Sequence, residues 1–123
     1  MASTVPSHIF KEILIELKLN SGIYASAIVL KDGLIVASDM PSDINEETLA
    51  AMTATMLKAA ETVFTELNKG DIERIIIEGT HAKIIAAAAN KDFVLVSMAE
   101  PKATLGLILH NMNKAIGKLN QIT

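Results

Sequence analysis

The chain has 123 residues and a formal net charge of −3, with ten lysines scattered singly along it and Arg74 as its one arginine. Proteins that bind nucleic acids or anionic membranes present a basic face, so this composition argues against both classes. No apolar run approaches the roughly 20 residues that span a bilayer, so no membrane insertion is expected.

The chain has no cysteine, which excludes disulfides, thiolate metal ligands and cysteine nucleophiles. Its aromatic residues are three Phe and one Tyr, so the core must be aliphatic. The N-terminal residues lack the basic and long apolar regions of a secretory signal. We therefore expect one domain over residues 1–123 and a cytoplasmic location.

The first predicted elements are a helix over 7–19 and a β-hairpin. Apolar residues recur with the helical period of 3.6 up to the stop signal Asn20-Ser21-Gly22. Two apolar runs follow, 23–30 and 34–38, and the Asp32-Gly33 pair between them is a strong hairpin signal.

A long helix is predicted from Asn45, a suitable N-cap, to about residue 68, before Gly70. Its apolar arc is wider than the roughly 100° of an ordinary surface helix. We expect a helix of this kind to pack against more than one neighbour. The arc contains Leu49, Ala50, Met52, Ala54, Met56, Leu57, Val63, Phe64 and Leu67.

Three more strands, 72–78, 82–89 and 93–99, are separated by turns short enough for antiparallel hairpins, and a last helix covers 103–120. Five hairpin-linked strands and three apolar-faced helices predict an α/β (α+β) domain. Its antiparallel sheet carries helices on its faces.

This order of elements resembles the roadblock/dynein light-chain family over nearly the whole chain. The signature is an apolar run, Asp32-Gly33 and a second apolar run ending in Ala37, followed by the long helix and by Thr104-Leu105-Gly106-Leu107. The resemblance implies a profilin-like roadblock fold with strand order 2-1-5-4-3. The long helix then lies on one face of the sheet and the two terminal helices on the other.

The resemblance further implies a homodimer joined through the third strand and the long helix. Family members are non-catalytic, and they bind small Ras-like GTPases as scaffolds or regulators or link cargo to dynein. The residues also favour a dimer, because the third strand is apolar on both faces and would be an aggregation hazard as a free edge. The expected interface residues are Ile72, Arg74, Ile75, Ile76, Ile77, Glu78, Ala50, Ala54, Leu57 and Glu61.

No catalytic, cofactor or metal site is expected. His8, His81 and His110 lie far apart in the sequence without metal-ligand spacing, and the glycines form no phosphate-binding loop. Arg74, the only candidate arginine finger, falls in the strand expected to pair with its twin. A role as a scaffold is therefore a simpler assignment than direct activation of a GTPase.

Two apolar residues fit their helices poorly, and Ile15 and Leu107 are candidates for a small docking patch on the terminal helices. Two alternatives to the GTPase scaffold stay open. One is an adaptor subunit of a motor or larger complex without GTPase contact, and the other is a small-ligand sensor.

Overall fold

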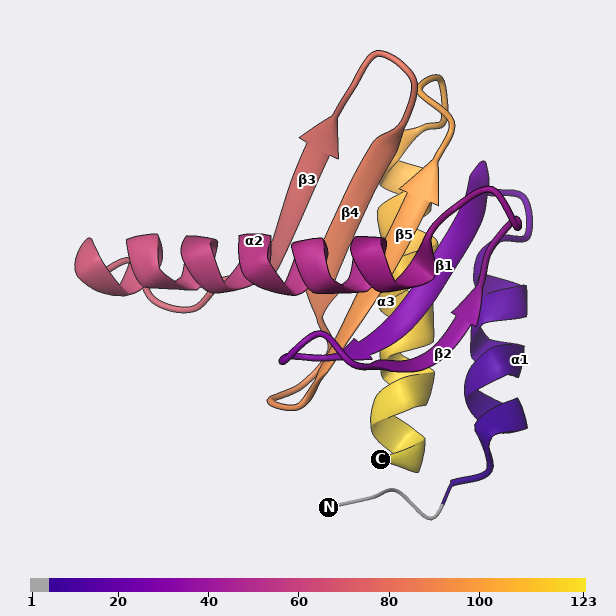
Figure 1. Ribbon diagram of the computed structural model, residues 1–123, viewed down its shortest axis with the longest axis horizontal. Coiled ribbons are helices and arrows are strands. Elements are labelled where there is room, and N and C mark those ends of the chain that lie inside the picture. The colour runs from indigo at the N-terminus through magenta and orange to yellow at the C-terminus, as the bar shows by residue number, and fades with distance from the viewer. Residues whose placement is uncertain (1–4) are drawn as a thin grey trace.

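The computed structural model describes residues 5–123 and places a five-stranded sheet between one long helix and a pair of helices (Figure 1). The elements in chain order are α1 (Ser7–Leu17), β1 (Ile23–Leu30), β2 (Ile35–Asp39), α2 (Glu46–Glu66), β3 (Arg74–Glu78), β4 (Lys83–Ala88), β5 (Phe93–Ala99) and α3 (Leu105–Ile122).

The sheet has the order β2-β1-β5-β4-β3, and every neighbouring pair is antiparallel. This confirms the predicted fold and strand order. The third strand is shorter than expected, because regular pairing begins at Arg74 and leaves Ile72 outside the strand. Ile72 instead packs its half-buried side chain against the core beneath α2.

Each face of the sheet carries its own apolar core. The larger core joins α1 and α3 to the sheet, with Leu14, Ile28, Leu95, Ile108 and Met112 almost fully buried. Strand residues of opposite parity face α2 in the second core, since successive side chains of a strand point to opposite faces. The members of this smaller core are Val29, Ala50, Leu57, Ala86, Val94 and Val96.

The β1–β2 turn contains the Asp-Gly pair and touches α2. Gly33 has φ +98°, a conformation that favours glycine, and its N–H donates to Leu30 O at 2.9 Å. A Cβ at Gly33 would lie 3.5–3.9 Å from the first half of α2, so the turn packs closely on that helix. Lys31 Nζ reaches Glu61 Oε2 of α2 at 3.6 Å.

Candidate functional site: an open strand edge and an overhanging helix

β3 is the last strand of the sheet, so one of its sides has no neighbouring strand. Gly79 N donates to Ala82 O at 2.8 Å, and Ala88 N donates to Glu73 O at 3.2 Å, so odd-numbered residues direct their backbone groups towards β4. The direction of the backbone groups alternates along a strand. The residues whose N–H and C=O face the open edge are therefore Arg74, Ile76 and Glu78.

The opposite edge of the sheet is covered. α1 packs along β2, where Lys11 Nζ donates to the carbonyl of Ser38. About two turns further along, at the C-cap of α1, Lys18 Nζ lies 3.0 Å from Asp39 Oδ2. Placing a helix and lysines at an edge strand is a common way to keep other strands from pairing with it. β2 is protected in this way, whereas β3 is the edge strand on the other side of the sheet.

The side chains at the open edge form a charged–apolar–charged row. Arg74, Ile76 and Glu78 share the sheet face of α1 and α3, because their β4 partners Ala87 and Ile85 belong to that core. Ile76 is 40% exposed, and the Arg74 guanidinium lies 3.8 Å from the carboxylate of its sequence neighbour Glu73. Ile75 and Ile77 face the α2 side, where both are half-buried.

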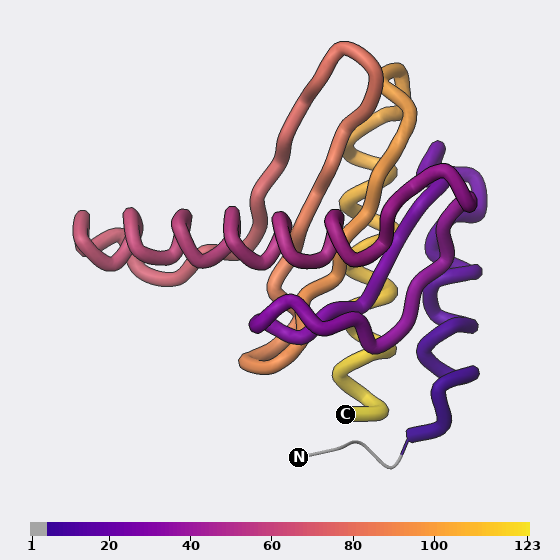
Figure 2. Tube along the Cα trace, in the orientation of Figure 1, coloured from indigo at the N-terminus to yellow at the C-terminus, as the bar shows by residue number. Residues whose placement is uncertain are grey.

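α2 is longer than the sheet beneath it is wide. A 21-residue helix is about 32 Å long, whereas five strands spaced ~4.8 Å apart span about 19 Å. The helix crosses the strands steeply and projects beyond β3 (Figure 1). In Figure 2 the chain turns back below this projecting end before it enters β3.

The projecting end of α2 together with its C-cap Leu67, residues 62–67, is here called the overhang. The last fully buried residue of α2 is Leu57, and every residue from 62 to 70 is exposed. The apolar stripe nevertheless continues along the overhang with helical spacing, through Val63, Phe64 and Leu67. Beyond the sheet, the apolar face of α2 therefore stays partly exposed, and no strand of the described residues 5–123 lies beneath it.

The four α2 residues expected at the dimer interface contact their own protomer instead. Ala50 and Leu57 are only 1% and 2% exposed because they pack on the sheet in the smaller core. Ala54 is half-buried beside the turn at Gly33, and Glu61 pairs with Lys31 of that turn. Ala50 and Leu57 therefore offer no surface to a second copy, and the expectation for these two is wrong.

The overhang residues were missed as interface candidates because the helical wheel assigns them to the same stripe as the core residues. Periodicity identifies the apolar face of a helix, but it does not say how far that face is supported. A comparison of helix length with sheet width was the available signal. This comparison distinguishes the stripe residues that lie beyond the edge of the sheet from those that pack on it.

The three histidines lie apart from one another in the structure. His8, His81 and His110 are all exposed and lie on different elements, and within residues 5–123 no three His, Asp or Glu side chains are grouped so that they could hold a metal ion. Burial, and then the negative charges of Glu100 and Asp43, raise the pKa of Tyr24, which keeps its phenol protonated. Among the helices of the described residues, none is long and apolar enough to cross a membrane.

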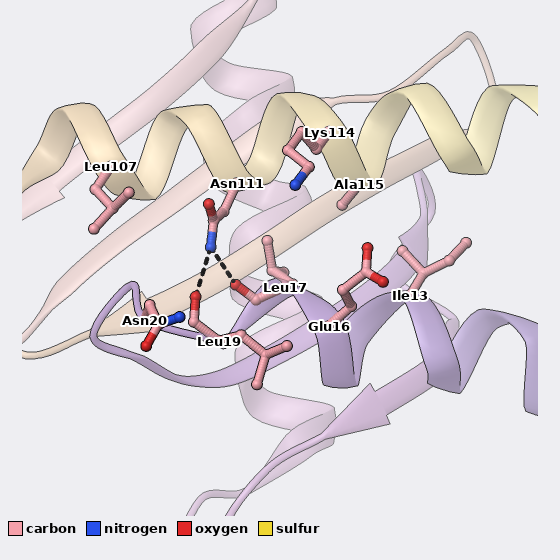
Figure 3. Close-up of a pocket in the computed structure, with 9 residues that line it drawn as sticks. All are labelled: Ile13, Glu16, Leu17, Leu19, Asn20, Leu107, Asn111, Lys114 and Ala115. Atoms are coloured by element: carbon pink, nitrogen blue, oxygen red, sulfur yellow. Dashed lines mark hydrogen bonds between the residues drawn. The ribbon is translucent and has the colours of Figure 1, made fainter.

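A groove of about 360 Å³ lies between α1 and α3, on the face of the sheet opposite α2 (Figure 3). Leu107 and Ile15, the two residues expected to form a docking patch, are both exposed. Leu107 lines this groove, but Ile15 does not, because it lies two residues from both Ile13 and Leu17 and so points away from that side of the helix. The two residues therefore do not share one patch.

The antiparallel sheet between one long helix and a helix pair defines an α+β protein of the profilin-like class. Acanthamoeba castellanii profilin II shares this arrangement at a TM-score of 0.58 and 17% identity, with 80% of this chain and 85% of profilin covered. A model of the Roadblock/LC7 domain matches residues 9–99. The chain belongs to the Roadblock/LC7 domain family.

Relatives and solved structures agree with this assignment. The uncharacterized protein MJ0310 of Methanocaldococcus jannaschii is 36% identical over 107 residues, which cover 87% of this chain and 93% of the relative. Myxococcus xanthus MglB superposes with a TM-score of 0.91 at 19% identity, over 99% of this chain and 92% of that chain. A second MglB structure, with a tetrameric arrangement, has a TM-score of 0.89 at 19% identity, with 99% and 93% covered.

Proposed function

We propose that this protein is a non-catalytic, homodimeric scaffold that binds a small Ras-like GTPase in the cytoplasm. The observation that carries the dimer is the open β3 edge, which is complementary to a second copy of itself. The family resemblance supports the GTPase as the partner, and the tetrameric arrangement of MglB supports self-association in proteins of this fold.

The β3 edge is self-complementary in one register. If two β3 strands pair antiparallel about a twofold axis at Ile76, a residue that precedes Ile76 in one copy faces the residue that follows Ile76 by the same number of positions in the other copy. Arg74 of each copy then faces Glu78 of the other, and the two Ile76 side chains meet at the axis. Directly opposite side chains in a sheet have Cβ atoms about 4.5–5.5 Å apart, and each favourable pair contributes roughly 0.2–1 kcal/mol.

The overhang supplies the apolar part of the proposed interface. Because α2 projects beyond β3, its overhang would lie over the region where the sheet of the second copy continues. Because Val63, Phe64 and Leu67 are only 36–60% exposed in the protomer, burying the rest of each contributes about 0.7–1.5 kcal/mol, and twofold symmetry doubles the sum. Association costs an estimated 4–15 kcal/mol in lost freedom, so the overhang and the paired edge are both needed.

Arg74 also bears on the kind of GTPase partner. An arginine finger supplied in trans stabilises the transition state of GTP hydrolysis, and such a residue must be free to reach the nucleotide. In the proposed dimer Arg74 is held beside Glu78 of the second copy, and the chain has no other arginine. The protein therefore acts as a scaffold that holds the GTPase and does not complete its active site.

The test is a binding measurement with each small Ras-like GTPase of the host, loaded with GDP or a non-hydrolysable GTP analogue. We expect the wild-type dimer to retain at least one of them. If the dimer forms and none binds, the GTPase assignment is wrong. Co-purification of a stable complex without any GTPase would then identify the chain as an adaptor subunit.

A further inference from the structure

The groove between α1 and α3 has a buried apolar floor and an apolar mouth (Figure 3). Ile13, Leu17 and Ala115 form the floor and belong to the larger core. Leu19 and Leu107, which line the same groove, are largely exposed. Aliphatic side chains that entered here would therefore find contacts on the floor and on both sides.

The α3 side of the groove carries a positive charge that no residue of α1 neutralises. Glu16 forms an ion pair with Lys118 across the groove. Lys114, one turn before Lys118, also lines the groove, and its nitrogen points towards α1 in Figure 3. Among residues 5–123 no ion pair involves Lys114. Because Lys118 already pairs with Glu16, the charge of Lys114 is left uncompensated at the groove, and an acidic group on an occupant would balance it.

The backbone of the groove is already satisfied. Asn111 Nδ2 donates to Leu17 O and to Leu19 O, both at 3.0 Å, and so caps the carbonyl end of α1. Ile13, Glu16, Leu107, Lys114 and Ala115 lie within the two helices, whose backbone groups are engaged in helical turns, and Leu19 N donates to Glu16 O at 3.2 Å. A strand could not add to these walls through main-chain hydrogen bonds, so recognition must come from side chains, as when a helix docks into a groove.

We propose that this groove is a second docking site, which receives an amphipathic helix of a partner protein. The helix places aliphatic side chains between Leu19 and Leu107 and an aspartate or glutamate against Lys114. The groove lies on the sheet face opposite α2, and the lining residues include none of β3. Each protomer of the proposed dimer thus keeps one groove open.

The experiment is a selection from a surface-displayed library of helical peptides of about 16 residues, long enough to sustain a helix. The library varies the apolar and charged positions, and the labelled wild-type protein is the bait. We expect enriched peptides to carry Leu or Ile with Asp or Glu three or four residues away. Their affinity should fall about tenfold in Lys114→Glu and stay unchanged in Lys58→Glu, a matched charge reversal on exposed α2.

A reciprocal result is also expected: peptides in which the acidic residue is replaced by lysine should regain affinity for Lys114→Glu. Binding of the enriched peptides should shift the NMR signals of the Asn111 side-chain amide and of the Leu107 methyl groups. The proposal is overturned if no peptide is enriched over a Leu107→Glu bait, or if the enriched peptides do not distinguish Lys114→Glu from wild type. Assembly beyond a dimer that Leu107→Glu abolishes would also overturn it, because the occupant would then be a second copy.

Discussion

Arg74 and Glu78 stand at the two ends of β3, with Ile76 midway between them. Their order is what makes the edge complementary to itself, since a twofold axis at Ile76 places opposite charges together at both ends. If the two residues exchanged places, opposite charges would still face each other across the axis, whereas two like charges would repel. Exchange of the charges of Arg74 and Glu78 tests this complementarity.

Arg74→Glu should weaken the dimer by about 10- to 100-fold, because two ion pairs become two pairs of like charges. The double variant Arg74→Glu/Glu78→Arg should recover most of the affinity, since it restores both pairs with their directions reversed. Sedimentation equilibrium gives the dissociation constants. A double variant as weak as the single one would show that the two residues do not face each other.

Gly22 tests the packing between the turn after α1 and the segment before α3. Its φ is +81°, and a Cβ added there would lie 2.6 Å from the Cβ of Ala103. Gly22→Ala should lower the free energy of unfolding by about 1–2 kcal/mol through the backbone conformation and by a further ~1–3 kcal/mol through overpacking.

Gly70 provides the matched control for that measurement. It has a similar φ of +84°, but nothing lies within 4 Å of an added Cβ. Gly70→Ala should therefore show only the backbone part of the loss in a urea titration. Equal losses in the two variants would mean that the contact at Ala103 relaxes without cost.

At the scale of elements, the two ends of α2 differ in how the sheet supports them. Its first half packs on the sheet through Ala50, Thr53 and Leu57. Its last turns continue the same apolar stripe beyond β3, where Val63, Phe64 and Leu67 stay 36–60% exposed. The division follows from geometry, because the helix is about 32 Å long and the sheet is about 19 Å wide.

The double variant Phe64→Ser/Leu67→Ser should reduce dimer affinity by at least about 100-fold, since both side chains lose the area they bury on association. Far-UV circular dichroism should be unchanged, because both residues are exposed in the protomer. Leu34→Ser, which removes a comparably exposed leucine from the β1–β2 turn, is the control and should dimerise normally. Unchanged affinity in the double variant would remove the overhang from the interface.

The elements themselves were predictable from local signals. Asp32-Gly33, the capping residue Asn45 and the apolar periods place every helix and strand to within a few residues. The strand order came from the family resemblance, because hairpins do not specify how β1 comes to pair with β5. The supported part of α2 depends on where the sheet stops, and the separation of Ile15 from Leu107 depends on which sides of α1 and α3 meet in the groove. Periodicity within one segment contains neither piece of information.

At the scale of the whole molecule, the sheet has one covered edge and one open edge, and its two faces are differently occupied. α1 and its lysines cover β2, whereas β3 ends the sheet on the other side. Pairing through β3 would extend the sheet into the second copy and leave both α1–α3 faces outside the interface. A dimer of this kind presents several separate surfaces, as a scaffold requires.

The most direct test of this account is the molar mass of the protein at micromolar concentration, measured by light scattering during size-exclusion chromatography. We expect twice the 13.2 kDa of one chain. Ile76→Lys should give the mass of one chain, because it places two charges at the axis, whereas Ile15→Lys, at a position of similar exposure (45% against 40%), should remain a dimer. A wild-type mass of 13.2 kDa, or a dimer that Ile76→Lys leaves intact, would contradict self-association through β3.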